Sequence, residues 1–446
     1  MSWILGVVLV LGVMILVHEW GHFAMARLFK VRVDVFSIGF GPRLFGWKRG
    51  ATDYRLSALP LGGYVRMAGQ DLAEMDSGDK PPTGAPDELM SKPRWQRALI
   101  SAAGPAVNLV FPILLLTGLY AIKGEPYGAY LDAPVQVTAL PAKSATPSAP
   151  LRVGDKIVSM DGVQNPTWDQ ADRIILSASS GAHLALEVEN SGERRKVDLV
   201  LPNRDSDQFG QIFGYAPVDP VIDEVTTGFP ADRAGLQVGD KIVSVDGQAV
   251  QLWGQFVDRV RGSSGSPVVV GFARKGETRQ VTITPEKQPM PQGGFAFVIG
   301  IGVHEDIRYH PMAFSQAVAT ASQKTYITIS DTVGIVGKLV SGKVSIKQLQ
   351  GPVGISSEAG KAVKRGGVSV IALMVLISVN LGILNLLPIP ILDGGNILLL
   401  AIEGGLRRDL SLAFKERYIQ VGLVFLLVVF AIVMYHDVLR RLPIHS

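Results

Sequence analysis

Four long stretches of apolar residues dominate the pattern of the chain. They run over roughly 2–26, 98–122, 368–387 and 418–435. Each comes close to the ~20 residues with which an α-helix crosses ~30 Å of hydrocarbon. The first has no basic residue before its apolar run and stays apolar beyond a polar cluster, which favours a retained helix over a cleaved signal peptide. The pattern predicts a polytopic α-helical membrane protein with four transmembrane helices.

Basic residues near the ends of these stretches predict how the chain crosses the membrane. They gather after the first stretch, before the second, and between the third and fourth: Arg27, Lys30, Arg32, Lys92, Arg94, Arg97, Arg407, Arg408, Lys415 and Arg417. Short loops rich in Lys and Arg stay in the cytoplasm. The long segment over 123–366 is therefore expected on the far side, which in a bacterium is the periplasm.

Composition excludes several classes of function. The chain has 446 residues, 47% of them hydrophobic, and a net charge of only +4. It has no long basic run with interleaved aromatic residues, so a nucleic-acid partner is not expected. It also has no cysteine, which excludes disulfides and thiol nucleophiles and leaves any metal ion to His, Asp and Glu.

The far-side segment contains an internal repeat. Val153–Gly162 reads VGDKIVSMDG and Val238–Gly247 reads VGDKIVSVDG, and Trp168 and Trp253 follow the two copies at the same spacing. Alternating apolar runs that end in Asp-Gly are typical of strands and turns. The repeat therefore predicts two copies of one small β-rich domain, each of roughly 85 residues.

A candidate catalytic motif lies in the first apolar stretch. His18-Glu19-x-x-His22 is the H-E-x-x-H pattern. Residues four apart on a helix face the same way, so both imidazoles can share one metal ion with the carboxylate beside it. A catalytic zinc leaves one position for water, from which Glu19 would take a proton as general base. The alternative is a helix end whose polar residues reach the interface, although Phe23–Ala26 stay apolar beyond them.

A third metal ligand has to come from another part of the chain. Asp393 is an isolated carboxylate that follows Pro388 and Pro390 and precedes two glycines. Such residues break a helix, and irregular backbone at membrane depth is tolerated where it lines a polar cavity. We therefore predict Asp393 as the third ligand, with a turn at the cytoplasmic surface as the alternative. Asn385 is placed to hold a substrate backbone or to polarise the scissile carbonyl.

The H-E-x-x-H motif, Leu392-Asp393-Gly394 and the paired repeats together resemble the site-2 protease family, over nearly the whole chain. The resemblance implies an intramembrane zinc metalloprotease of the bacterial inner membrane, with its active site toward the cytoplasm. Its substrates would be single-pass membrane proteins, namely an anti-sigma factor after a first periplasmic cut, and remnant signal peptides. The residues implied are Glu19 as base, His18, His22 and Asp393 as ligands of Zn²⁺, and Asn385, Pro388 and Pro390 as substrate contacts.

The resemblance extends to two further segments. Tyr54–Met67 looks like the re-entrant β-hairpin of the family, with a turn signal at Pro60–Gly63. An exposed strand edge there would hold an unwound substrate, and Gly62 and Gly63 are counted among the expected substrate-binding residues. Gly104–Asn108 reads Gly-Pro-x-x-Asn, which also matches the family, and both a packing role and a catalytic role are open for it.

The two repeats resemble PDZ domains of the bacterial type, in which a Gly-Leu-x-x-Gly-Asp segment opens onto a peptide-binding groove. The second copy has this segment at Gly235–Asp240, whereas the first copy has Pro150 in place of the first glycine. Such a groove adds an extended peptide as a strand to a sheet edge. The alternative is that the pair acts only as a spacer or steric filter above the membrane.

These expectations combine into a membrane protein of four helices, with a cytoplasm-side re-entrant β-hairpin and two inserted periplasmic PDZ domains. The expected divisions are a membrane core over 1–124, PDZ domains over 125–216 and 217–303, an amphipathic connecting region over 304–366, and the rest of the core over 367–446. Apolar residues over 314–340 fit one helix face, which either lies on the membrane surface or packs as an ordinary helix. The polar loop over 71–88 is expected to be mobile.

Two other classes of function are compatible with parts of this pattern. A non-catalytic membrane scaffold needs the PDZ pair but has no use for three metal ligands. A metal or ion transporter can use intramembrane His and Asp, but it needs neither Glu19 beside the ligands nor paired PDZ units. The intact H-E-x-x-H motif favours the protease over both.

Overall fold

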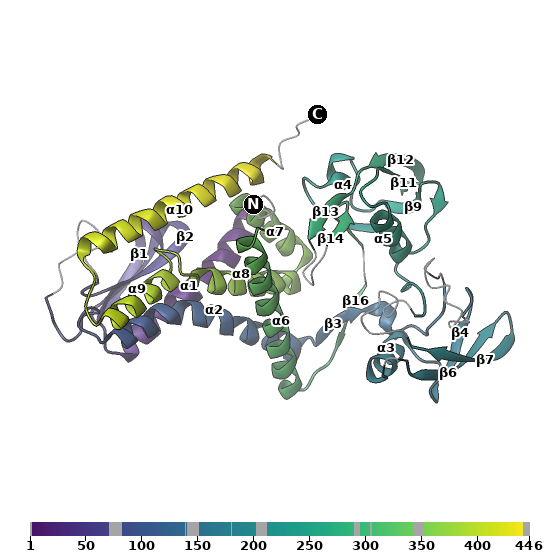
Figure 1. Ribbon diagram of the computed structural model, residues 1–446, viewed down its shortest axis with the longest axis horizontal. Helices are drawn as coiled ribbons and strands as arrows, with labels where there is room; N and C mark the ends of the chain where they lie inside the picture. The colour runs from purple at the N-terminus through teal and green to yellow at the C-terminus, as the bar shows by residue number, and fades with distance from the viewer. Residues whose placement is uncertain are drawn as a thin grey trace. The chain divides into compact units, whose positions relative to one another are not determined.

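A computed structural model describes residues 2–70, 83–138, 140, 151–179, 181–201, 212–289, 295–303, 306–342 and 351–439. Contacts divide the chain into two compact units, one formed by Met1–Glu125 with Pro311–Leu442 and the other built on Pro126–His310 (Figure 1). Most of the loop expected to be mobile lies outside the described residues.

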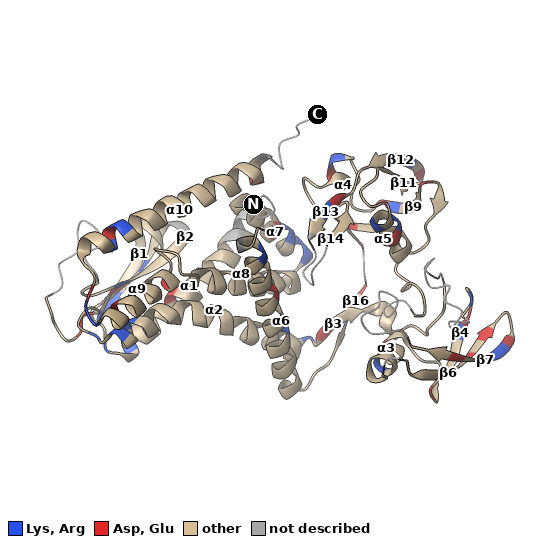
Figure 2. Cartoon of the chain, viewed as in Figure 1, with Lys and Arg blue, Asp and Glu red and all other residues tan. Residues whose placement is uncertain are grey.

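Four helices of the first unit are long and apolar enough to cross a membrane. They are α1 (Ser2–Leu28), α2 (Arg94–Ile122), α8 (Gly367–Asn385) and α10 (Leu412–Leu439). Figure 2 shows that their charged residues lie mainly near helix ends. The four helices predicted from the apolar stretches are confirmed among the described residues, with bounds a few residues wider than predicted for α2 and α10.

Glycines allow these helices to approach closely. A methyl group added at Gly21 of α1 would stand 2.5 Å from the carbonyl oxygen of Ala103 in α2, and one at Gly382 of α8 would stand 3.0 Å from that of Pro105. Small residues at such crossings let helix backbones pack without an intervening side-chain layer. Helix α2 is therefore held between α1 and α8 at the depth of the predicted metal site.

Three shorter or less apolar helices complete the helical part of this unit. They are α6 (Phe314–Val340), α7 (Pro352–Arg365) and α9 (Asp393–Leu406). The helix expected over 314–340 is confirmed as α6. Its Ala317 and Ala321 are fully buried against α2 and α8, whereas Phe314 and Tyr326 are about 70% exposed. One face of α6 is thus packed, and apolar residues remain on the other.

A two-stranded sheet follows α1. It consists of β1 (Val33–Arg49) and β2 (Thr52–Met67). Ile38 of β1 is paired both with Leu56 and with Gly63 of β2, so the first part of β1 lies between the two halves of β2. The segment over 63–67 then has β1 on one side only and forms an edge of the sheet. The two halves of β2 run in opposite directions along β1, so the chain turns back between Leu56 and Gly63, where the turn was predicted. The sheet is larger than a hairpin confined to Tyr54–Met67, because β1 lies between these two halves and joins β2 at Gly50, in the left-handed conformation (φ 63°).

The second unit contains two four-stranded sheets of the same order. The first has the order β5-β4-β6-β7 and the second β10-β9-β11-β12, with one helix after the second strand of each copy. The first copy comprises β4 (Lys156–Met160), β5 (Val163–Gln164), α3 (Trp168–Ser177), β6 (His183–Asn190) and β7 (Glu193–Val200). The second comprises β9 (Lys241–Val245), β10 (Gln248–Ala249), α5 (Trp253–Gly262), β11 (Val268–Arg274) and β12 (Glu277–Ile283). The shared order confirms the internal repeat.

Shorter elements surround these sheets. They are β3 (Glu125–Gly128), a 3₁₀ turn η2 (Ala129–Asp132), β8 (Ile222–Val225), α4 (Pro230–Arg233), β13 (Glu286–Pro289), β14 (Phe295–Val298), β15 (Ile301–Val303) and β16 (Ile307–His310). Strand β3 pairs with β16, β8 with β15, and β13 with β14. Each repeat has its own hydrophobic core, one around Met160 and the other around Ile242.

A buried Asp–Arg pair recurs in both repeats. Asp240 is 1% exposed, accepts a hydrogen bond from the backbone N–H of Gln237 and pairs with Arg274 at 2.7 Å. Asp155 makes the same kind of pair with Arg195 in the first repeat. Each pair ties the loop that precedes a central strand to the neighbouring hairpin. Pro150, which stands in for glycine in the first copy, lies outside the described residues.

Candidate metal centre

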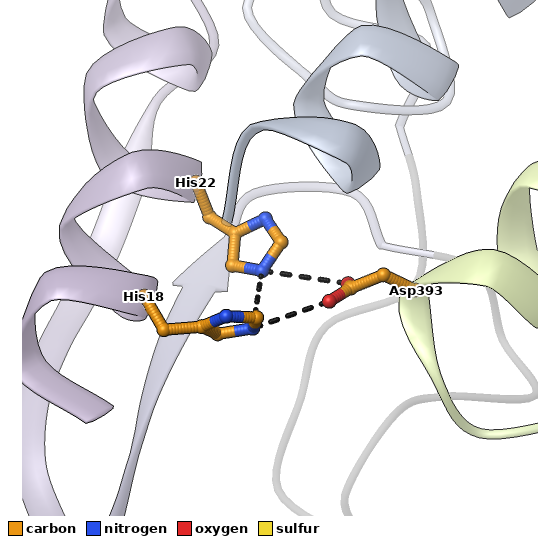
Figure 3. Close-up of side chains that lie close together, drawn as sticks. All are labelled: His18, His22 and Asp393. Atoms are coloured by element: carbon orange, nitrogen blue, oxygen red, sulfur yellow. Dashed lines mark hydrogen bonds and ion pairs between the residues drawn. The ribbon is translucent and has the colours of Figure 1, made fainter. Parts of the chain in front are cut away.

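The three predicted metal ligands meet in the first unit. His18 and His22 lie one turn apart on α1, and Asp393 is the first residue of α9 (Figure 3). The two Nε2 atoms are 3.2 Å apart. Oδ2 of Asp393 lies 3.2 Å from His18 Nε2, and Oδ1 lies 3.4 Å from His22 Nε2. Residues almost four hundred positions apart therefore direct their donor atoms at one point.

These spacings fit a tetrahedral zinc ion. Zinc bonds to His nitrogen and carboxylate oxygen are about 2.0–2.1 Å long, so neighbouring ligand atoms of a tetrahedron stand about 3.3 Å apart. The separations of 3.2 Å between the two Nε2 atoms, and of 3.2 and 3.4 Å from them to the two oxygens of Asp393, lie close to that value. Two imidazoles and one carboxylate also leave a fourth position open, as catalytic zinc sites do.

The chain after α8 explains how Asp393 reaches this point. Helix α8 ends at Asn385, and the backbone is irregular until α9 begins. A methyl group at Gly394 would overlap the carbonyl groups of Leu386 and Leu387, so this turn needs a residue without Cβ next to Asp393. The loop after α8 therefore packs against the first turn of α9, where Asp393 is the first helical residue.

The other ring nitrogen of each histidine is also held. His22 Nδ1–H donates to the carbonyl oxygen of Ile100 in α2, at 2.8 Å. Because a carbonyl only accepts, this bond leaves the lone pair of His22 on Nε2. His18 Nδ1 lies 3.1 Å from the side-chain amide nitrogen of Asn108, which is also in α2. Such partners fix the orientation of metal-binding imidazoles.

Gly104 of α2 has no side chain, which leaves space for the imidazole rings of His18 and His22. A side chain there would meet Nε2 of His22 and Cε1 of His18. The sequence match at Gly104–Asn108 therefore has a structural basis at the site itself, since one end of the segment clears the imidazoles and the other end contacts one of them.

Glu19 lies on the same face as the histidines and against the sheet. Its Cγ would stand 3.0 Å from a methyl group added at Gly63 in β2. Glu19 and the two histidines line one cavity of about 360 Å³, together with Tyr64, Val65 and Met67 of the sheet edge. The carboxylate thus faces the space in which a peptide would lie beside the metal ligands.

Of the predicted substrate-binding residues that the structure describes, Asn385 is the one that lines the cavity beside the metal ligands. Its side-chain nitrogen is 3.3 Å from His18 Nε2. Pro390 packs against Gly422 of α10, where a side chain would collide with it. Among the described residues that line the cavity, neither Pro388 nor Pro390 appears, and Gly62 and Gly63 are also absent.

The far wall of the cavity is a cluster that sequence reasoning did not single out. Glu403 of α9 is 1% exposed and lies 3.1 Å from Lys415 and 3.5 Å from Arg97. It also accepts the backbone N–H of Leu410. These charges join three helices at one end of the first unit, and no local pattern links positions 97, 403 and 415.

Comparison with known proteins identifies the family of the chain. The sequence profile of Peptidase family M50 matches residues 6–429. The regulator of sigma-E protease RseP of Salmonella typhimurium is 33% identical over 456 residues and the one of Escherichia coli 32%, and each alignment covers 97% of both chains. A solved PDZ domain from Listeria monocytogenes covers 20% of this chain and 88% of its own at 24% identity, with a TM-score of 0.17, too low to establish the fold of the matching part. The chain therefore belongs to Peptidase family M50, and it is a membrane-embedded metalloprotease of the site-2 type.

Proposed function

We propose that the protein is a zinc protease that hydrolyses peptide bonds within the transmembrane segments of single-pass membrane proteins. In this proposal His18, His22 and Asp393 hold the zinc ion, and Glu19 is the general base. The observation that carries it is the convergence of three side chains, whose Nε2 and carboxylate oxygen atoms lie 3.2–3.4 Å apart, in a cavity that a carboxylate from the same motif also lines.

The chemistry divides between the ion and the protein. A zinc ion held by His18, His22 and Asp393 would polarise the scissile carbonyl and lower the pKa of the attacking water. The Glu19 carboxylate would accept a proton from water and deliver it to the departing amine nitrogen. Asn385, with its amide beside His18, is placed to donate a hydrogen bond to the scissile carbonyl oxygen as charge develops there.

The edge of the sheet supplies a place for the substrate. A helical peptide bond is shielded, so the substrate has to unwind before attack. Residues 63–67 pair with β1 on one side, and Tyr64, Val65 and Met67 line the cavity beside Glu19. An extended segment added to this edge would exchange main-chain hydrogen bonds with it, as in other cases of strand addition. A side chain at Gly62 would collide with the ring of Phe40, so the chain needs a residue without Cβ just before this edge.

Membrane placement follows from exposed apolar residues and charge. Leu44, Phe45 and Trp47 of β1 are 59–67% exposed, which favours contact with lipid by this end of the sheet and supports a re-entrant position from the cytoplasmic side. The Lys- and Arg-rich ends of α2 and α10 support a proposed orientation with the active site toward the cytoplasm and the repeats over 125–216 and 217–303, as PDZ domains, in the periplasm. The inner membrane of a bacterium is the compartment that this arrangement fits.

The proposed substrates are membrane proteins with a single transmembrane segment and no bulky periplasmic domain. The relatives are named as regulators of sigma-E, and a single-pass anti-sigma factor shortened by a first periplasmic cut is the matching substrate class. Remnant signal peptides have the same single apolar segment. Two periplasmic repeats above the membrane would exclude substrates that keep a bulky outer domain.

Replacement of Glu19 by Gln tests the proposal. Purified protein in detergent, or reconstituted in lipid, is incubated with a single-pass substrate that lacks its periplasmic domain. We expect cleavage by the wild type, none by Glu19→Gln, and equal zinc content in both, because the amide keeps the shape of the side chain but cannot accept the proton. Undiminished cleavage by Glu19→Gln, or a wild type without zinc, would contradict the proposal.

A further inference from the structure

We propose that Asn108 is a positioning residue that holds the His18 imidazole by accepting a hydrogen bond from its Nδ1–H through the side-chain oxygen. The inference rests on the proposed metal site and adds a residue outside the motifs that supply the ligands. Asn108 would act on the reaction only through His18.

The contact is buried and specific. Asn108 has no exposed surface, and its side-chain amide faces His18 Nδ1 at 3.1 Å from α2 to α1. The other amide atom, Oδ1, is buried without a hydrogen-bond partner. Oxygen and nitrogen of an amide have nearly the same shape, so the hydrogen-bond network decides which of them faces the ring. The unpartnered, buried Oδ1 is therefore available to face the ring nitrogen after a half-turn of the amide.

Metal binding decides the direction of this hydrogen bond. His18 Nε2 is the atom that faces His22 Nε2 and Asp393, so it has to provide its lone pair to the ion. A neutral imidazole that gives up the lone pair of Nε2 carries its hydrogen on Nδ1. An amide NH₂ cannot accept that hydrogen, whereas the amide oxygen can. Asn108 therefore turns Oδ1 toward His18 when the site holds zinc.

The two histidines differ in the acceptor that each has for its Nδ1–H. His22 Nδ1–H has the backbone carbonyl of Ile100 as its acceptor, which no substitution removes. His18 depends on a side chain for the same purpose. The backbone of Asn108 is itself anchored, since its carbonyl oxygen accepts a hydrogen bond from the buried hydroxyl of Ser378 in α8, at 2.7 Å. One residue thus connects the metal-binding face of α1 to α8, the helix that ends at Asn385.

The chain offers a matched set of variants for the test. Asn108→Leu keeps the size of the side chain and removes the acceptor. Asn108→Asp restores an acceptor, and it creates the carboxylate–histidine arrangement found around other zinc sites. Ser378→Ala removes a buried hydrogen bond at the same place without touching the contact with His18, and it controls for packing.

Zinc affinity is the primary measurement, by chelator competition on full-length purified protein. Loss of an outer partner of a zinc-bound histidine lowers metal affinity by about 10–100-fold. We expect that loss for Asn108→Leu, recovery to within a few-fold of wild type for Asn108→Asp, and wild-type affinity for Ser378→Ala. The visible spectrum of the cobalt-loaded protein should shift in Asn108→Leu alone, because the ring of His18 is no longer held. Thermal melts of the metal-free proteins report whether each variant is folded.

Several results would overturn the inference. Wild-type zinc affinity and an unchanged cobalt spectrum in Asn108→Leu would show that the amide does not hold the ring. Equal losses in Asn108→Leu, Asn108→Asp and Ser378→Ala would show a packing role only. A failure of the proposed function itself looks different: His18→Ala would then keep full zinc content, whatever stands at position 108.

Discussion

The close crossing of α1 and α2 at Gly21 makes a sharp prediction about the metal site. Gly21 stands next to His22, and a methyl group added there would lie 2.5 Å from the carbonyl oxygen of Ala103 and 3.0 Å from Cα of Gly104. Both obstacles are backbone atoms of α2, which no rotamer change can move aside. Gly21→Ala therefore forces the two helices apart.

The displacement can be worked out from these distances. Ordinary van der Waals contact begins at 3.4 Å, so α1 has to move by about 0.9 Å relative to α2. Helix α9, which carries Asp393, packs on α2, so the shift separates the imidazoles from the carboxylate. Productive metal–ligand distances vary by only about ±0.2 Å. Overpacking of this kind costs about 1–3 kcal/mol, which lowers stability without abolishing the fold.

Gly12→Ala is the matched control, because no atom lies within 4 Å of the methyl group that it would add to the same helix. We expect Gly21→Ala to lose zinc affinity by at least ~10-fold and to lose cleavage, while Gly12→Ala matches the wild type in both. Chelator competition and the substrate assay measure the two effects. Wild-type zinc affinity in a folded Gly21→Ala protein would refute the reasoning.

Two further predictions concern buried charges. Glu403→Gln should lower the free energy of unfolding of the detergent-purified protein by about 3–5 kcal/mol, because the cationic partners of Glu403 remain buried without its charge. Asp409→Asn is the control: it removes an exposed ion pair with Arg94 and should cost at most ~1 kcal/mol. In the second repeat, burial raises the pKa of Asp240 but Arg274 and a backbone N–H outweigh it, so the net pKa is lowered. Stabilisation by ionised Asp240 is then present above the ordinary pKa of an aspartate and lost as pH falls through the lowered value. Hydrogen exchange of β9 in the full chain should accelerate below that pH in wild type, and Asp240→Asn should remove this dependence; an unchanged pH profile would contradict it.

The sequence predicted the features that depend on local pattern. Long apolar runs predict where α1, α2, α8 and α10 lie, because length and hydropathy suffice to span a bilayer. The four-residue spacing of His18 and His22 predicts that both rings face one point, and the helix-breaking residues around Asp393 single it out. The internal repeat predicts that two sheets share one strand order.

Features that depend on pairing between distant segments were not predictable in the same way. The composition of Pro60–Gly63 predicts that the chain turns back there, but it does not indicate that β1 lies between the two halves of β2, because that depends on pairing with the earlier segment over 33–49. The contact of Glu403 with Arg97 joins residues 306 positions apart, and nothing in either neighbourhood indicates the other. The acceptor for His22 is a backbone carbonyl, at Ile100, which any residue would supply.

The central claim is that two histidines of the first helix and one late aspartate bind a single zinc ion. Zinc content per chain, measured on purified wild type, Glu19→Gln, His22→Ala and Asp393→Ala, tests it most directly. The account predicts about one zinc ion per chain in the first two proteins and almost none in the last two, with all four folded. Full zinc content in Asp393→Ala would contradict it.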